Sequence, residues 1–213
     1  MNLRLARQKQ DELHSTASTL LSNKKIPELL TKYGELRYVG SYATELMVKP
    51  DIDIELVNPN ITADDVIELT SAFFKMKDNY SVEIADSTEY IRRPGHPRGY
   101  YVGVNIMYQN VRWHMDIWIT PEPIDTSGSA YASLRKQDWY KDIDQETRDA
   151  ILLIKHQLSE LGEYSKYASV NVYESVLVGG VRSLEDFYKW AETFDTEALF
   201  RRGESESTRT SGS

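Results

Sequence analysis

The chain has 213 residues, of which 40% are hydrophobic, and this is enough to bury a core in one compound domain or two small ones. The absence of cysteine excludes disulfides, thiol nucleophiles and thiolate metal sites, and the formal net charge of −8 disfavours a surface that holds long nucleic acid. No apolar run is long enough to cross a bilayer and no signal segment is evident, so we expect a soluble, cytoplasmic protein without a membrane partner.

The first region of the chain is predicted to be helical and to lead into a sheet. Apolar residues recur at near-helical spacing over residues 2–32, where Pro27 can open a second short helix. A short strand is expected over 35–39, followed by a turn at Gly40-Ser41, a helical turn, and a second strand over 51–57.

A helix and three further strands are predicted next. Thr62 followed by Asp65 resembles a capping box, which would start a helix whose apolar side supports the core. A strand is expected over 80–86. The alternating segments on either side of Gln109-Asn110, over 100–120, should pair as a hairpin.

The composition changes near residue 125, and the chain beyond this point is predicted to be helical. Helices are expected over 145–161, 168–178, 184–192 and 195–201. We therefore predict an α+β fold, with a mixed-sheet domain and its N-terminal helix over residues 1–125, a C-terminal helical bundle over 126–202, and a disordered tail over 203–213.

Two aspartates on the second predicted strand indicate a metal site. Asp51 and Asp53 alternate with isoleucines, so both carboxylates point from one face of the strand, where like charges repel each other. A later strand carries Asp116, and a mixed sheet can bring the three carboxylates together at one edge. The alternative is a solvated strand face, and we expect Glu55 to lie at its exposed end.

Clustered carboxylates suit hard divalent cations, chiefly Mg²⁺ with Mn²⁺ as an alternative. Two such ions can activate an attacking oxygen and stabilise a leaving pyrophosphate in an in-line displacement. In the preceding turn, Gly40 lets the backbone approach a ligand closely, and Ser41 can present its hydroxyl and amide to a phosphate. A Gly-Ser pair alone marks any loop, but its place shortly before the two aspartates makes it informative.

Together these residues resemble the polymerase-beta-like nucleotidyltransferase superfamily. Its pattern is apolar-Gly-Ser, a short spacer, Asp-apolar-Asp-apolar, and a third acid on a later strand, and segments 39–41 and 51–54 match it in order and spacing. The resemblance implies a nucleotidyltransferase core. It also implies that Asp51, Asp53 and Asp116 are catalytic and bind two metal ions, and that Gly40 and Ser41 bind the nucleotide.

The helical half is similar to the helical domain of archaeal-type CCA-adding enzymes, poly(A) polymerases and oligoadenylate synthases. This resemblance implies that Lys155 and Tyr164 contact the nucleotide triphosphate, and that Ser169 binds it too. The helical pattern itself places Lys155 at the margin of the apolar stripe, where the alternative is a lysine that only covers apolar surface. The family's Ala-Arg-Gly stretch after Gly-Ser is replaced here by Ala43-Thr44-Glu45, so one positive phosphate contact is missing.

Two further groups remain open at this stage. His114 shares the strand face of Asp116 and either orients a proton of the acceptor or is simply hydrogen-bonded to its neighbours. A basic loop either guides a phosphorylated acceptor or is a solvated loop; it consists of Arg92, Arg93, His96 and Arg98.

The sequence predicts a magnesium-dependent nucleotidyltransferase that transfers NMP, most simply AMP, from ATP or another NTP held in a cleft between the two domains, with release of pyrophosphate. Asp116 is expected nearest the attacking oxygen, and the expected acceptor is a hydroxyl of a small molecule or a protein. One alternative is a tRNA-type RNA 3′-end nucleotidyltransferase, which the acidic charge disfavours. Another is a non-catalytic nucleotide-binding regulatory module.

Overall fold

The computed structural model describes residues 3–90, 96–124, 139–167 and 169–193. The chain divides into two compact units, one formed by Glu12–Ser127 and the other by Met1–Asp11 with Gly128–Ser213. The predicted boundary near residue 125, the helix over 195–201 and the tail over 203–213 lie outside the described residues.

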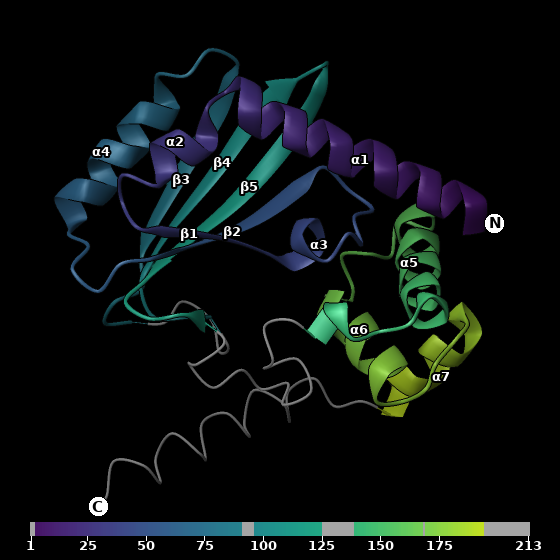
Figure 1. The fold of residues 1–213 in the computed structure, drawn as a ribbon. Helices are drawn as coiled ribbons and strands as arrows, with labels where there is room; N and C mark the ends of the chain where they lie inside the picture. Colours follow the sequence, from purple (N-terminus) through teal and green to yellow (C-terminus); the bar gives the residue numbers. More distant parts are fainter. Residues whose placement is uncertain (1–2, 91–95, 125–138, 168, 194–213) are drawn as a thin grey trace, which may run out of the picture. The chain divides into compact units, whose positions relative to one another are not determined.

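The unit Glu12–Ser127 is built on a five-stranded mixed sheet (Figure 1). Its strands are β1 (Glu35–Val39), β2 (Asp51–Val57), β3 (Asn79–Asp86), β4 (Tyr100–Tyr108) and β5 (Val111–Thr120). They lie in the order β1-β2-β5-β4-β3, in which β2 and β5 are parallel and the other neighbouring pairs are antiparallel. The predicted α+β fold with a mixed sheet is therefore confirmed.

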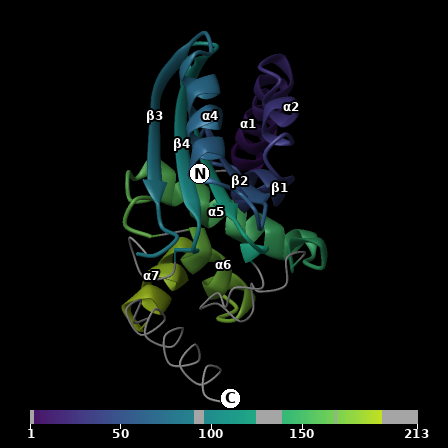
Figure 2. The ribbon, with the colours of Figure 1, turned by 90° about the vertical axis from the view of Figure 1, so that its left-hand side faces the viewer.

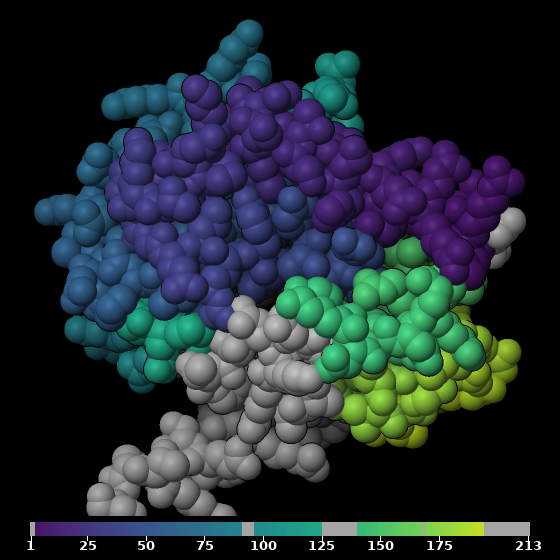
Figure 3. Space-filling model, in the orientation of Figure 1, coloured from purple at the N-terminus to yellow at the C-terminus, as the bar shows by residue number. Residues whose placement is uncertain are grey.

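Helices cover one face of this sheet (Figures 1 and 2). They are α1 (Leu3–Asn23), α2 (Ile26–Leu30) and α4 (Ala63–Phe74), and a short helix, α3 (Gly40–Ala43), follows β1. In the space-filling view, the purple atoms of α1 and α2 lie in front of the sheet, and few of the teal atoms of β4 and β5 can be seen (Figure 3). The apolar side of the sheet is thereby removed from water.

The period of two in the strands separates an apolar face from a polar one. In β2, Ile52, Ile54 and Leu56 are fully buried in the core beneath the helices. Burial of each such side chain contributes roughly 1.5–3 kcal/mol relative to exposure. The residues between them, Asp51 and Asp53, consequently point from the opposite face, and this face carries the candidate site.

Two local signals in the sequence are confirmed. The backbone N–H of Asp65 donates to Thr62 Oγ1 (3.2 Å) and that of Thr62 donates to Asp65 Oδ2 (2.9 Å), which is the reciprocal pattern of a capping box at the start of α4. Gln109 and Asn110 have φ angles of 51° and 62°, the backbone that a tight β4–β5 hairpin requires.

The other unit contains α5 (Gln145–Glu160), α6 (Ser169–Leu177) and α7 (Leu184–Thr193), which pack on one another as the sequence predicted. Asp144 caps α5, because its side chain accepts a hydrogen bond from the N–H of Thr147 (2.8 Å). Among the described helices of both units, none is both long enough and apolar enough to span a bilayer.

Candidate active site

The acidic residues meet where the two parallel strands of the sheet are paired. Asp51 is the cross-strand neighbour of His114, and Asp53 is the neighbour of Asp116, so the four side chains leave the same face. Strand β5 is the central strand of the sheet. The predicted position at one edge is therefore wrong, since the acids lie on the polar face at the middle of the sheet.

Three of these side chains form a group that could hold a metal ion. Asp51, His114 and Asp116 each offer one ligand atom, and these atoms lie within 4.8 Å of one another. Asp51 is only 6% exposed, and its Oδ1 is buried without a hydrogen-bond partner among the described residues. An unsatisfied buried oxygen costs about 1–3 kcal/mol or more when charged, so the donor set fits a divalent cation that would bind this atom.

Asp53 lies next to this group rather than within it in the described structure, and its carboxylate packs against the Gly-Ser turn. Gly40 has a φ angle of +61°, and a Cβ atom added to it would lie 1.9 Å from Asp53 Oδ2. Only glycine fits this close approach. Helix α3 also begins at Gly40 itself, two positions earlier than the predicted helical turn, and it buries Ser41.

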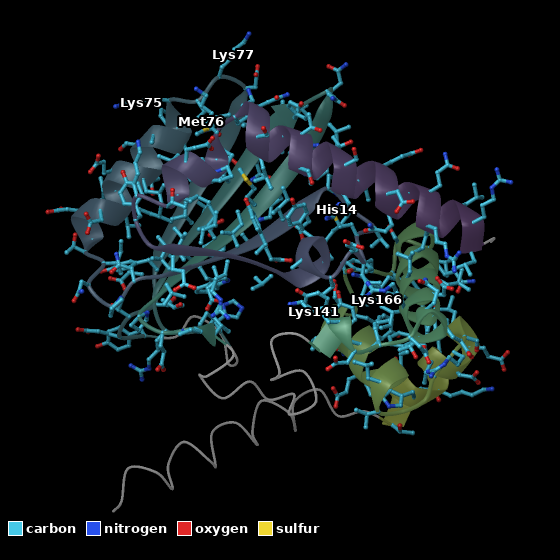
Figure 4. All side chains as sticks on the ribbon, in the orientation of Figure 1. His14, Lys75, Met76, Lys77, Lys141 and Lys166 are labelled. Carbon is cyan, nitrogen blue, oxygen red and sulfur yellow. The ribbon has the colours of Figure 1, made fainter. Side chains whose placement is uncertain are left out.

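An aromatic stack that the sequence analysis missed holds α3 in place. The ring of Tyr42 stacks on His14 of α1 at 4.8 Å and meets the edge of Tyr38 at 5.0 Å. His14 points from α1 toward α3 (Figure 4). The hydroxyl of Tyr42 also lies 3.1 Å from Ser18 Oγ, so α1 fixes the position of the turn.

Hydrogen bonds surround the carboxylate of Asp116. Its Oδ1 accepts from the hydroxyl of Tyr101 (2.5 Å) and lies 3.0 Å from Nε2 of His114, whose Nδ1 lies 3.1 Å from Asn105 Oδ1. Burial alone would raise the pKa of Asp116, but the bonds from His114 and Tyr101 outweigh it and lower the pKa. The same bond raises the pKa of His114 despite its burial. His114 is thus hydrogen-bonded to its neighbours, as one of the two alternatives predicted.

A lysine that the sequence analysis did not single out reaches the acidic group. Lys49 Nζ lies 2.6 Å from Asp51 Oδ2, and 49% of the lysine side chain is exposed. Its charge also contributes to the lowered pKa of Asp116. A position two residues before Asp51 on the same chain segment was the only signal for it in the sequence.

The prediction that Glu55 lies at the exposed end of the strand is wrong. This residue is 1% exposed rather than solvated, and its Oε2 lies 3.2 Å from Nη1 of Arg37, its cross-strand neighbour on β1. Its Oε1 accepts a hydrogen bond from the N–H of Ile124. The paired cation and the backbone donor offset the cost of burying this charge, and Glu55 is a structural residue.

In the helical unit, the structure changes the expected setting of Lys155. This lysine is fully buried rather than marginal, and its Nζ lies 3.0 Å from the hydroxyl of Tyr173 and 5.1 Å from the centre of that ring. The hydroxyls of Tyr164 and Ser169, which the resemblance assigned to the nucleotide, hydrogen-bond to each other. The nucleotide-binding roles of these residues stay predictions.

The basic loop is only partly described. Arg92 and Arg93 lie outside the described residues. The ring of His96 packs edge-on against Trp118 at 5.3 Å, and Arg98 donates to the carbonyl of Thr88 at 3.4 Å. Whether the loop guides an acceptor stays a prediction.

No protein-family model matches the sequence, and no curated protein is similar to it. Solved structures are similar to it in fold. One is the poly(A) polymerase complex GLD-2–GLD-3, with 14% identity and a TM-score of 0.51 over 83% of this chain. Another is a cytoplasmic RNA terminal U-transferase, with 13% identity and a TM-score of 0.51 over 82% of this chain.

This likeness concerns the fold. The match covers 58% of the matched chain of the GLD-2–GLD-3 complex and 53% of that of the U-transferase, so this chain spans little more than half the length of the chains it matches. The α+β fold with a mixed sheet that the resemblance implied is confirmed, and the acidic group lies on the polar face of this sheet.

Proposed function

We propose that the chain is a magnesium-dependent nucleotidyltransferase, which transfers NMP from an NTP to a hydroxyl and releases pyrophosphate. The observation that carries this proposal is the buried Oδ1 of Asp51, which has no hydrogen-bond partner among the described residues and lies beside Asp116 and His114. A protein interior accepts such a carboxylate oxygen when a cation completes its contacts. The fold shared with a poly(A) polymerase complex and an RNA terminal U-transferase supports the same chemistry by analogy only, because function depends on the site and not on the fold.

In this proposal Asp51, Asp53 and Asp116 hold two Mg²⁺ ions, with Mn²⁺ as a substitute. When bound, such ions increase the acidity of the acceptor hydroxyl and neutralise charge on the departing pyrophosphate. Hydrogen bonds lower the pKa of Asp116 despite its burial, so its carboxylate stays ionised at neutral pH, and its charge supports loss of the proton from the attacking oxygen.

The nucleotide is proposed to bind at the turn that contacts Asp53. Gly40 contributes its backbone to this site, since the space left by its absent Cβ is occupied by the Asp53 carboxylate, and Ser41 supplies a hydroxyl and an N–H. Lys155, Tyr164 and Ser169 are proposed to complete the nucleotide site. Because Lys155 is held by Tyr173, its ammonium group would have to exchange that hydroxyl for a phosphate oxygen. ATP is the first nucleotide to test.

The acceptor has two candidates. The 3′-hydroxyl of an RNA end is favoured by the likeness in fold, because the names of two similar structures are those of a poly(A) polymerase complex and an RNA terminal U-transferase. A hydroxyl of a small molecule or a protein is favoured by the net charge of −8, since a negatively charged surface repels a long phosphate backbone. We place the RNA 3′ end first. Because the protein is negatively charged, we expect it to contact only a short stretch of the RNA.

The test is a transfer assay on the full chain with each NTP labelled at its α-phosphate, Mg²⁺, and a short RNA. We expect the label to join RNA with a free 3′-hydroxyl and not the same RNA with a 3′-deoxy end. Asp51→Asn should reduce transfer to background, because one metal-ligating charge is lost. The matched control is Asp64→Asn, which changes an exposed aspartate on α4 and should transfer like wild type.

Other outcomes separate the alternatives. Pyrophosphate release that requires a small-molecule or protein acceptor instead of RNA would assign the second acceptor. Thermal stabilisation by ATP and Mg²⁺ without pyrophosphate release on any acceptor would contradict the enzyme and favour a regulatory nucleotide-binding module.

A further inference from the structure

Tyr101 reaches the acidic group from a strand that carries no acid of that group. It lies on β4, and its hydroxyl donates to Asp116 Oδ1 on β5 at 2.5 Å. Its ring also packs against Trp118, with the ring centres 5.1 Å apart. Two contacts therefore fix the orientation of the Tyr101 side chain across the polar face: the aromatic contact of its ring and the hydrogen bond of its hydroxyl to a charged acceptor.

A glycine on the same strand makes this orientation of Tyr101 possible. Gly103 is the cross-strand neighbour of Asp116, and a Cβ atom at this position would lie 2.6 Å from the Tyr101 hydroxyl and 3.1 Å from its Cζ. Any larger residue at position 103 would thus occupy the space through which Tyr101 reaches Asp116. Gly103 and Tyr101, which are separated by a single residue on β4, therefore act together: the first leaves the space that the hydroxyl of the second needs to reach Asp116.

The two donors around Asp116 act on the same oxygen. Tyr101 and His114 both contact Oδ1, so Oδ2 is outside both of these bonds. Two donors on one oxygen fix the rotation of a carboxylate about its terminal torsion, which is otherwise broad. Hydrogen bonds of this kind orient metal-ligating carboxylates and make them better prepared for the ion.

We propose that Tyr101 and Gly103 are positioning residues that hold the Asp116 carboxylate in its metal-binding orientation. Tyr101 acts through its hydroxyl, and Gly103 acts by leaving space for that hydroxyl. This inference rests on the proposed function, because it assumes that Asp116 is a ligand of the divalent ion. It assigns a role in the site to β4, which contributes no carboxylate to it.

The test is a Mn²⁺ titration of the full chain without nucleotide, followed by electron paramagnetic resonance of the free ion. Tyr101→Phe keeps the ring and removes the hydroxyl, and it should weaken Mn²⁺ binding by about tenfold or more. Gly103→Ala should produce a similar loss by displacing the hydroxyl. The double variant should be no weaker than Tyr101→Phe alone, because both changes remove the same hydrogen bond.

The matched control is Tyr80→Phe, which makes the same chemical change at an exposed tyrosine on β3 and should bind Mn²⁺ like wild type. Thermal unfolding without metal separates positioning from folding, since Tyr101→Phe should unfold close to the wild-type temperature. If Gly103→Ala does not fold, Tyr101→Phe alone decides the question.

Two results would overturn the inference: wild-type Mn²⁺ affinity in Tyr101→Phe, or losses that add in the double variant. Asp116→Ala distinguishes this failure from that of the proposed function. If Asp116→Ala loses Mn²⁺ binding while Tyr101→Phe keeps it, only the positioning role is wrong. If Asp116→Ala also binds Mn²⁺ normally, the proposed metal site itself is wrong.

Discussion

At the scale of single residues, the site balances negative charge with a small number of donors. Asp51 is buried, and Lys49 Nζ contacts its Oδ2 while its Oδ1 has no partner among the described residues. Asp116 has its charge stabilised by Tyr101 and His114. Asp51 can therefore accept a further positive charge. The ammonium group of Lys49, which contacts its Oδ2, would compete with a metal ion for this carboxylate.

Lys49→Gln should therefore strengthen the binding of a divalent ion. The lysine of this pair is half exposed, so solvent screens the interaction to about 0.2–1 kcal/mol, and removal of the competing ammonium group should lower the apparent dissociation constant for Mn²⁺ by up to about fivefold. Lys75→Gln, at the end of α4 (Figure 4), is the matched control and should leave the constant unchanged. Weaker Mn²⁺ binding in Lys49→Gln would show that the lysine supports the ion instead of competing with it.

Gly40→Ala should damage both folding and the site. An L residue at a φ near +60° costs about 1–2 kcal/mol of unfolding free energy, and here the new Cβ would also displace the Asp53 carboxylate. Gly180→Ala is the control, because Gly180 has a φ of +66° with nothing within 4 Å of its added Cβ. Both variants should unfold at lower denaturant, but only Gly40→Ala should lose nucleotidyl transfer. Equal transfer in the two variants would contradict a role for Gly40 beside Asp53.

At the scale of elements, the strands could be predicted from the sequence, but the order and register in which they pair could not. The alternation of Asp51 and Asp53 with isoleucines fixes β2 and its faces, and Gln109-Asn110 fixes the hairpin. Tyr101 and Asn105 were missed, because their approach to β5 depends on strand order and register, which a single sequence does not state.

Burial of charged residues was the other unpredictable feature. Glu55 was expected in water, but Arg37 on the adjacent strand pairs with it and allows it to be buried. Lys155 was expected at the edge of the apolar stripe, but it is buried, and the hydroxyl of Tyr173 on α6 accepts a hydrogen bond from its ammonium group. In both cases the partner comes from another element, so the helical or strand period alone could not reveal it.

An ion pair between α1 and α5 gives a pH-dependent prediction within the helical unit. Burial alone would raise the pKa of Asp149, but hydrogen bonds from Arg7 and Gln145 outweigh it and lower the pKa. A lowered carboxyl pKa stabilises the fold above the unfolded pKa of about 3.9, and this stabilisation is lost as the pH falls through the folded value.

Asp149→Asn should accordingly lower the melting temperature at pH 7 by no more than a few degrees. The deficit should narrow as the pH falls below about 4, because the wild-type carboxyl then becomes neutral as well. Melting curves at neutral and acidic pH measure this, with Glu192→Gln as an exposed control on α7. A deficit that is unchanged in acid would show that the asparagine acts through packing and not through lost charge.

At the scale of the whole molecule, two observations bear on the proposed function: the shared fold and the net charge. The chain shares its fold with structures of a poly(A) polymerase complex and an RNA terminal U-transferase, spans little more than half the length of the matched chains, and carries a net charge of −8. The sequence motif alone indicated the metal chemistry, since Asp51, Asp53 and Asp116 follow a pattern with a physical reason. The acceptor is decided by surfaces that no motif describes.

The central claim is that the polar face of the sheet binds divalent ions for nucleotidyl transfer. The most direct measurement is anomalous diffraction from a crystal that contains Mn²⁺ and a non-hydrolysable ATP analogue. We predict Mn²⁺ peaks at roughly 2 Å from carboxylate oxygens of Asp51, Asp53 and Asp116. An ordered nucleotide with no Mn²⁺ bound to these three residues would contradict the account.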